Sequence, residues 1–157
     1  MKSHVQLLED TKEYYRTNPR SLDGEFCVYQ SENGSRCAIG RILPQRVCQE
    51  LDKKGGSGKH ILAWRDLVKG KGSFYNDEMR KWGEVPVLSQ TTTKRMNKLF
   101  SEYHLNFLKE LQNFHDQPEN WSKTTKRGTQ NLSACLGEHA YKELMAHAKE
   151  LDEHKVT

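Results

Sequence analysis

The sequence predicts a mainly helical fold with one small β-hairpin (α+β), arranged as a compact single domain over residues 1–157. Apolar residues recur at helical spacing in several segments, most clearly in residues 93–115 and 131–152. Residues 25–40 differ, because two short runs of strand-forming residues flank an Asn-Gly pair that is typical of a hairpin turn. A chain of 157 residues is also of a size at which one hydrophobic core is usual.

The first helix is predicted over residues 4–16. One face of this helix collects side chains at helical spacing, namely Leu7, Leu8, Thr11, Tyr14 and Tyr15. Pro19 disfavours helical geometry in the residue before it, so the helix is expected to end at Asn18.

The β-hairpin is predicted from residues 26–29 and 36–39, with its turn at residues 33–34. Side chains alternate between the two faces of a strand, so the length of the turn decides how two cysteines are placed. A two-residue turn puts Cys27 and Cys37 on opposite faces, whereas a three-residue loop puts them on the same face. The sequence leaves both arrangements open.

The rest of the chain is predicted as helices joined by polar, basic connections. A short helix follows Pro44 and covers residues 45–52, and another covers about 61–68. The strongest helical patterns are those of residues 93–115 and 131–152. Irregular basic loops are expected at about 53–60, 69–90 and 116–130.

Composition and charge narrow the classes of function. No apolar run approaches the roughly 20 residues that span a bilayer, and residues 1–10 do not resemble a signal peptide. A cytoplasmic protein with no membrane partner is therefore expected. The net charge of +4 permits an anionic partner without requiring one. None of the four cysteines belongs to a C-x-x-C pair, so no metal or other cofactor is expected.

Two basic features are candidates for binding an anion. Residues 53–60 form a glycine-rich loop that lacks the P-loop pattern but is suited to an anion-binding nest of backbone N–H groups. The sequence Thr-Thr-Lys-Arg at positions 92–95 begins a predicted helix, where hydroxyls, N–H groups and cations favour phosphate, and it recurs at 124–127. The residues expected to contact the ligand are Lys53, Lys54, Lys59, Lys94, Arg95, Lys126 and Arg127. The alternative interpretation is that these side chains are simply solvated.

His115 and Asp116 are the candidate catalytic residues. Such a pair can transfer protons in a hydrolase, although a protonated histidine is also favourable at the end of a helix. Neither a G-x-S-x-G nor an H-E-x-x-H motif accompanies the pair.

Two separated segments carry a recognisable pattern of residues. The first reads Ser21-Leu22-Asp23, Cys27-x-Tyr29, Gly34-x-Arg36-Cys37-Ala38-Ile39-Gly40 and Leu43-Pro44. The second reads Leu111-Gln112-x-x-His115-Asp116, followed by Trp121. This pattern resembles a group of small proteins of unknown function in tailed phages and prophages. The resemblance implies a phage accessory gene expressed in a bacterial cytoplasm, and it transfers no catalytic residues.

These observations favour a phage accessory protein that acts by binding. The resemblance implies inhibition of a host factor or a host defence system, and sequestration of an anionic nucleotide signal is one form of this. The partner would be an anionic nucleotide, a nucleic acid or a host protein, and a homo-oligomer is compatible with a closed ligand site. The alternatives are a nucleic-acid-binding accessory protein and a small hydrolase that uses His115 and Asp116.

Overall fold

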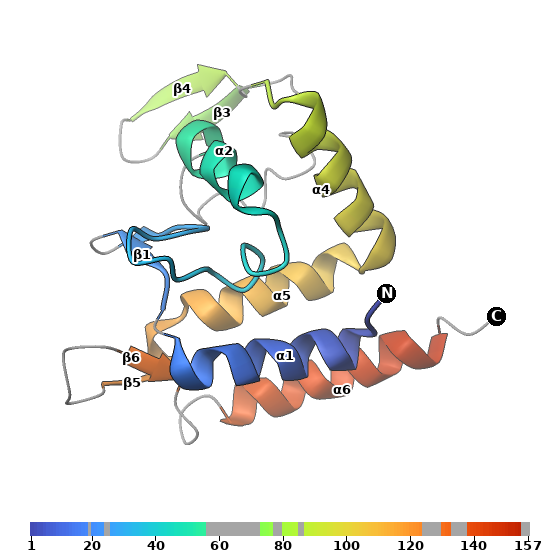
Figure 1. The fold of residues 1–157 in the computed structure, drawn as a ribbon. Coiled ribbons are helices and arrows are strands. Elements are labelled where there is room, and N and C mark those ends of the chain that lie inside the picture. The colour runs from blue at the N-terminus through green and yellow to red at the C-terminus, as the bar shows by residue number, and fades with distance from the viewer. Residues whose placement is uncertain are drawn as a thin grey trace.

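The computed structural model describes residues 1–18, 20–23, 26–55, 73–76, 80–84, 87–123, 130–132 and 138–154. Helices dominate this part of the chain (Figure 1). Its five α-helices are α1 (His4–Thr17), α2 (Gln45–Gly55), α4 (Gln90–Glu102), α5 (Leu105–Asp116) and α6 (Glu138–His154). A short 3-10 helix, η2 (Pro118–Asn120), follows α5.

One hydrophobic core includes side chains from all five of these helices. Helix α1 packs against α6, α5 packs against α6, and α2 packs against α4. Figure 1 shows α1 and α6 side by side and antiparallel. The most deeply buried core residues include Leu8, Ile39, Val47, Leu51, Met96, Phe107, Leu108, Leu111 and Ala148. None of the described helices is both long enough and apolar enough to cross a bilayer.

In the part of the chain that the structure describes, β-structure is limited to three antiparallel pairs of short strands. The pairs are β1 (Leu22–Asp23) with β2 (Phe26–Cys27), β3 (Ser73–Asn76) with β4 (Lys81–Glu84), and β5 (Trp121–Lys123) with β6 (Gln130–Leu132). Each pair stands alone, and none joins another to build a larger sheet among the described strands. Figure 1 shows them outside the packed helices. The fold is therefore mainly helical, and the α+β class predicted from the sequence is wrong.

The predicted β-hairpin over residues 26–29 and 36–39 is wrong as well. One isolated bridge joins Gln30 to Arg36 where a ladder was expected. Residues 38–42 then form turns, with the backbone N–H of residue 41 bonded to the carbonyl of residue 37 at 2.9 Å.

Local hydrogen bonds and a distant carboxylate explain why the hairpin does not form. A type I′ turn needs a positive φ at both Asn33 and Gly34, but of these two only Gly34 has one, at 87°. The side-chain oxygen of Asn33 instead accepts a hydrogen bond from the backbone N–H two residues later, at 2.9 Å. The backbone N–H groups of Tyr29 and Gln30 donate to the Asp52 carboxylate of α2, at 2.8 and 3.0 Å. They are therefore not available to a partner strand.

The single helix predicted over residues 93–115 is divided in two. Helix α4 ends at Glu102 because Tyr103 has extended backbone angles, φ −130° and ψ 147°. The backbone N–H of His104 then donates to Nε2 of His4 at 3.1 Å. In a continuous helix that N–H would bond to a carbonyl four residues earlier.

The other predicted elements are described in part. The first helix is confirmed, and the helix predicted over 45–52 continues to residue 55. The last helix was predicted to begin at residue 131, but residues 130–132 form β6 and α6 is described from residue 138. The helix predicted at about 61–68 lies outside the described residues.

Helix α6 also supplies a hydrogen-bond acceptor to the first turn of α1. The carboxylate of Asp152 accepts hydrogen bonds from the backbone N–H groups of His4 and Val5, at 2.9 and 3.0 Å. These groups have no partner within their own helix. Burial raises the pKa of Asp152, but the N–H groups of Val5 and His4 outweigh it, so the pKa lies below its ordinary value.

Candidate functional site

His115 lies in a buried polar cluster at the end of α5 and is 1% exposed. Its Nε2 atom accepts a hydrogen bond from the backbone N–H of Ser21 at 3.2 Å. That nitrogen must therefore be unprotonated, so the proton of the neutral ring is on Nδ1. The Nδ1–H group donates a hydrogen bond to Oδ1 of Asp116 at 2.8 Å. The hydroxyl of Ser21 donates to the carbonyl of Ser35 at 2.9 Å.

Two further side chains complete the cluster. Gln112 donates through Nε2 to Oδ1 of Asp116 at 2.8 Å, and its Oε1 accepts from the backbone N–H of Ile39 at 3.1 Å. The Nε1–H of Trp121 donates to the carbonyl of His115 at 2.7 Å. We refer to these residues as the buried polar network: Ser21, Ile39, Gln112, His115, Asp116 and Trp121.

The hydrogen bonds of the buried polar network give His115 and Asp116 a structural role that requires no catalysis. Burial lowers the pKa of His115, although the hydrogen bond to Asp116 partly opposes it. The ring is neutral, and both of its nitrogens are bonded to groups of the chain itself. A general acid or base needs a nitrogen within reach of a substrate, so this arrangement suits a structural role.

The two segments whose residue patterns were singled out in the sequence meet in this network. Gly40, from the first segment, is packed so closely that a Cβ there would lie 2.2 Å from the carbonyl oxygen of Tyr29. The backbone N–H of Gly40 donates to Sγ of Cys37 at 3.2 Å, and the Cys48 thiol donates to the Gly40 carbonyl at 3.3 Å. The Cys37–Gly40 part of the first segment therefore forms a tight turn.

The two buried thiols at this turn are held in their protonated form. Burial raises the pKa of Cys37 well above its ordinary value and that of Cys48 to about 11, so both stay protonated at neutral pH. The side chain of Cys27 lies outside the described part of the chain, so the prediction about the faces of Cys27 and Cys37 stays a prediction.

The basic residues predicted to bind an anion are only partly described. Lys53 is exposed on the last turns of α2, and Lys94 is exposed on the second turn of α4. Arg95 follows Lys94 and is half-buried, and its Nε has no hydrogen-bond partner. Lys54 belongs to α2, but its side chain lies outside the description. The remaining three, Lys59, Lys126 and Arg127, also lie outside it.

A carboxylate of the chain itself is already hydrogen-bonded to the start of α4. Glu50 of α2 accepts hydrogen bonds from the backbone N–H and the hydroxyl of Ser89, at 2.6 and 2.8 Å. It also accepts one from the hydroxyl of Thr92. Part of the donor set expected for a phosphate is thus occupied by a carboxylate.

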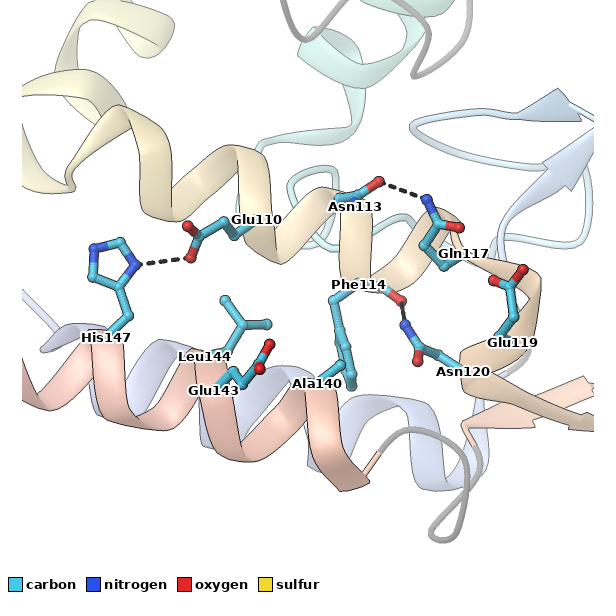
Figure 2. Close-up of a pocket in the computed structure, with 10 residues that line it drawn as sticks. All are labelled: Glu110, Asn113, Phe114, Gln117, Glu119, Asn120, Ala140, Glu143, Leu144 and His147. Atoms are coloured by element: carbon cyan, nitrogen blue, oxygen red, sulfur yellow. Dashed lines mark hydrogen bonds and ion pairs between the residues drawn. The ribbon is translucent and has the colours of Figure 1, made fainter.

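A surface pocket of about 610 Å³ lies between α5, η2 and α6. Its lining differs in chemistry from the basic residues that were predicted to bind an anion. It is lined by Glu110, Asn113, Phe114, Gln117, Glu119, Asn120, Ala140, Glu143, Leu144 and His147 (Figure 2). Its volume lies within the roughly 300–1,000 Å³ that is typical of ligand sites. It is therefore large enough to hold a side chain together with its neighbours in a peptide segment.

The pocket has an apolar floor and a polar rim. Phe114 and Leu144, 4% and 5% exposed, lie between the two helices in Figure 2. On the rim, His147 of α6 faces Glu110 of α5, with Nδ1 and Oε2 2.8 Å apart. Glu143 pairs with His139 outside the pocket, at 3.0 Å.

Sequence reasoning missed this pocket completely. Its polar residues recur on α5 and α6 at spacings of three or four, which is also the pattern of an ordinary solvated helix face. Only the packing of α5 against α6 brings the two faces together.

Comparison with known proteins leaves the site to be interpreted from its own geometry. No family model, curated protein or solved structure matches the chain. Within the described residues, no group of three or more histidine, cysteine, aspartate or glutamate side chains is arranged to hold a metal ion.

Proposed function

We propose that the chain is a phage accessory protein that binds a host protein, and that the binding site is the pocket between α5, η2 and α6. The observation that carries this proposal is a pocket with an apolar floor inside a polar rim. Buried apolar contacts supply most of the affinity at protein interfaces, while a polar rim supplies orientation.

Two further observations support binding rather than catalysis. His115 is enclosed by the chain and is 1% exposed, so we do not propose a hydrolase that uses the His115–Asp116 pair. The phage context rests on the resemblance, and the residues that carry it include those of the buried polar network. Such a network holds a scaffold together, and a scaffold can carry a binding surface elsewhere on the fold.

The proposal is tested by capture from a bacterial lysate with a variant that fills the pocket. Asn113 is exposed and lines the pocket, so Asn113→Trp should block it without disturbing the core. Asn97→Trp places the same side chain on an exposed position of α4 and is the matched control.

Captured proteins are identified by mass spectrometry, purified and measured again for direct binding. We expect one bacterial protein to bind the wild type and the Asn97→Trp control, and to be lost with Asn113→Trp. Equal binding to both variants, or no specific protein captured at all, would refute the proposed site.

An anionic ligand is the second candidate function, because Lys53 and Lys94 belong to α2 and α4, two helices that pack against each other. Lys53 follows Glu50 by about one turn of α2, and Glu50 contacts the start of α4, which carries Lys94. A nucleotide bound there at 100 times its Kd would stabilise the protein by about 2.7 kcal/mol in a thermal-shift screen. The double variant Lys94→Ala/Arg95→Ala should lose that shift, and a shift that persists in it would refute this site.

A further inference from the structure

We infer that the pocket between α5, η2 and α6 receives a lysine or arginine side chain from a basic segment of the partner protein. This inference rests on the proposed function and adds the chemistry of the occupant. It is carried by three features of the pocket: its charge, its unused hydrogen-bond acceptors and its apolar floor.

The charge of the pocket is opposite to that of the whole chain. Glu110, Glu119 and Glu143 line it, and no lysine or arginine does among the residues that the structure describes. The whole chain carries a net charge of +4, so these carboxylates form a local negative region on a positive protein. Such a region attracts a cation and repels an anion, and low-dielectric walls strengthen both effects.

The amide side chains add acceptors to this negative region. The Nδ2 of Asn120 donates to the carbonyl of Phe114, and the Nε2 of Gln117 donates to Oδ1 of Asn113, both at 2.9 Å. With these N–H groups engaged, the side-chain oxygens of Asn120 and Gln117 accept no hydrogen bond from any described residue. Lysine and arginine carry only donors, so they complement a rim that offers acceptors.

The apolar floor suits the stem of such a side chain. Phe114 points into the space between α5 and α6, beside Ala140 and Leu144 (Figure 2). Lysine and arginine bury their methylene stems on apolar surface while the charged head stays among polar groups. A small metal ion could not use this floor, and the described residues contain no metal-holding cluster.

The inference is tested by fluorescence polarisation with a labelled peptide of alternating arginine and leucine. The pocket variant is Glu110→Gln/Glu119→Gln/Glu143→Gln, in which all three positions are exposed and the fold should persist. The control variant, Glu13→Gln/Glu32→Gln/Glu153→Gln, changes three exposed glutamates outside the pocket and so has the same net charge.

We expect the pocket variant to weaken peptide binding about tenfold or more and the control about twofold or less, because the pocket charges act at short range. The Asn113→Trp variant should also abolish binding. An equal loss in both triple variants, or a wild type that does not bind the peptide, would overturn the inference.

The same variants separate this inference from the proposed function. If Asn113→Trp abolishes capture of the host protein but the triple pocket variant captures it normally, the partner uses the pocket without a cation. The inference then fails while the proposed function stands. If Asn113→Trp captures the host protein normally, the proposed function fails, and the peptide measurement alone decides whether the pocket binds cations.

Discussion

The imidazole of His115 is bonded to the backbone of Ser21, 94 residues earlier in the chain, with Nε2 3.2 Å from the amide nitrogen. This bond joins the end of α5 to the segment that follows α1. The other ring nitrogen donates to Asp116 at 2.8 Å. His115 therefore acts as a neutral bridge between two parts of the chain, and the first two predictions follow from its state.

Replacing His115 with alanine should destabilise the fold by about 2–4 kcal/mol, because it leaves a cavity and a buried N–H group without a partner. Urea unfolding followed by circular dichroism measures this loss. His139 is exposed on α6, so His139→Ala should change stability by about 0.5 kcal/mol or less. A similar small effect for both variants would contradict a structural role for His115.

Stability should fall as the pH falls below the ordinary pKa of histidine. Burial lowers the pKa of His115 in the folded protein, so below pH 6.5 the unfolded chain binds a proton that the folded chain does not. The contribution is complete above pH 6.5 and declines below it by up to about 1.4 kcal/mol per pH unit. Denaturant titrations between pH 7 and 5 measure the slope.

The control for this pH dependence is His115→Gln, which removes the titrating group. The slope of this variant between pH 7 and 5 should be smaller than that of the wild type. The lowered pKa values of Asp10 and Asp152 act below pH 3.8, outside this window. Identical slopes in the wild type and the variant would show that His115 does not titrate as described.

Two glycines in the same loop should respond differently to alanine. A Cβ at Gly40 would meet the backbone of Tyr29 at 2.2 Å, so Gly40→Ala should cost about 2 kcal/mol or more. Gly34 has a φ of 87° and open space around it, so Gly34→Ala should cost about 1 kcal/mol through backbone strain alone. Thermal unfolding of the two variants tests the order, and a larger loss at Gly34 would contradict the close contact at Gly40.

Removing the charge of Asp152 should loosen the start of α1. Asp152→Asn replaces a carboxylate that caps two backbone N–H groups, which should cost about 1–2 kcal/mol. Faster amide hydrogen exchange at the first residues of α1 is the specific readout. Glu153→Gln changes the exposed neighbour and should leave that exchange unaltered.

The sequence predicted helices better than it predicted turns, for a physical reason. The apolar stripes of α1 and α5 depend on spacing within one segment, and burial of Leu8 and Leu111 follows from it. The predicted hairpin does not form because Asp52 of α2 accepts hydrogen bonds from the backbone N–H groups of residues 29 and 30. The break between α4 and α5 likewise depends on His4. No local pattern contains such distant partners.

The candidate site shows the same limit more sharply. The sequence singled out His115 because histidine and aspartate are common in catalysis, and nothing local showed that Ser21 would take its free nitrogen. The pocket residues Glu110 and His147 are ordinary polar positions on two separate helices. Their significance arises only when α5 and α6 pack together.

The contact between α1 and Asp152 has a consequence for how the chain is made. Residue 152 follows His4 by 148 positions, so α1 leaves the ribosome long before the Asp152 carboxylate has been added to the chain. Because α1 also packs against β6 and α6, the nascent chain must carry this helix with its apolar face undocked while the intervening residues are synthesised. Synthesis at about 5–20 residues per second makes that interval about 7–30 s, during which Leu7 and Leu8 are open to chaperones or to other chains.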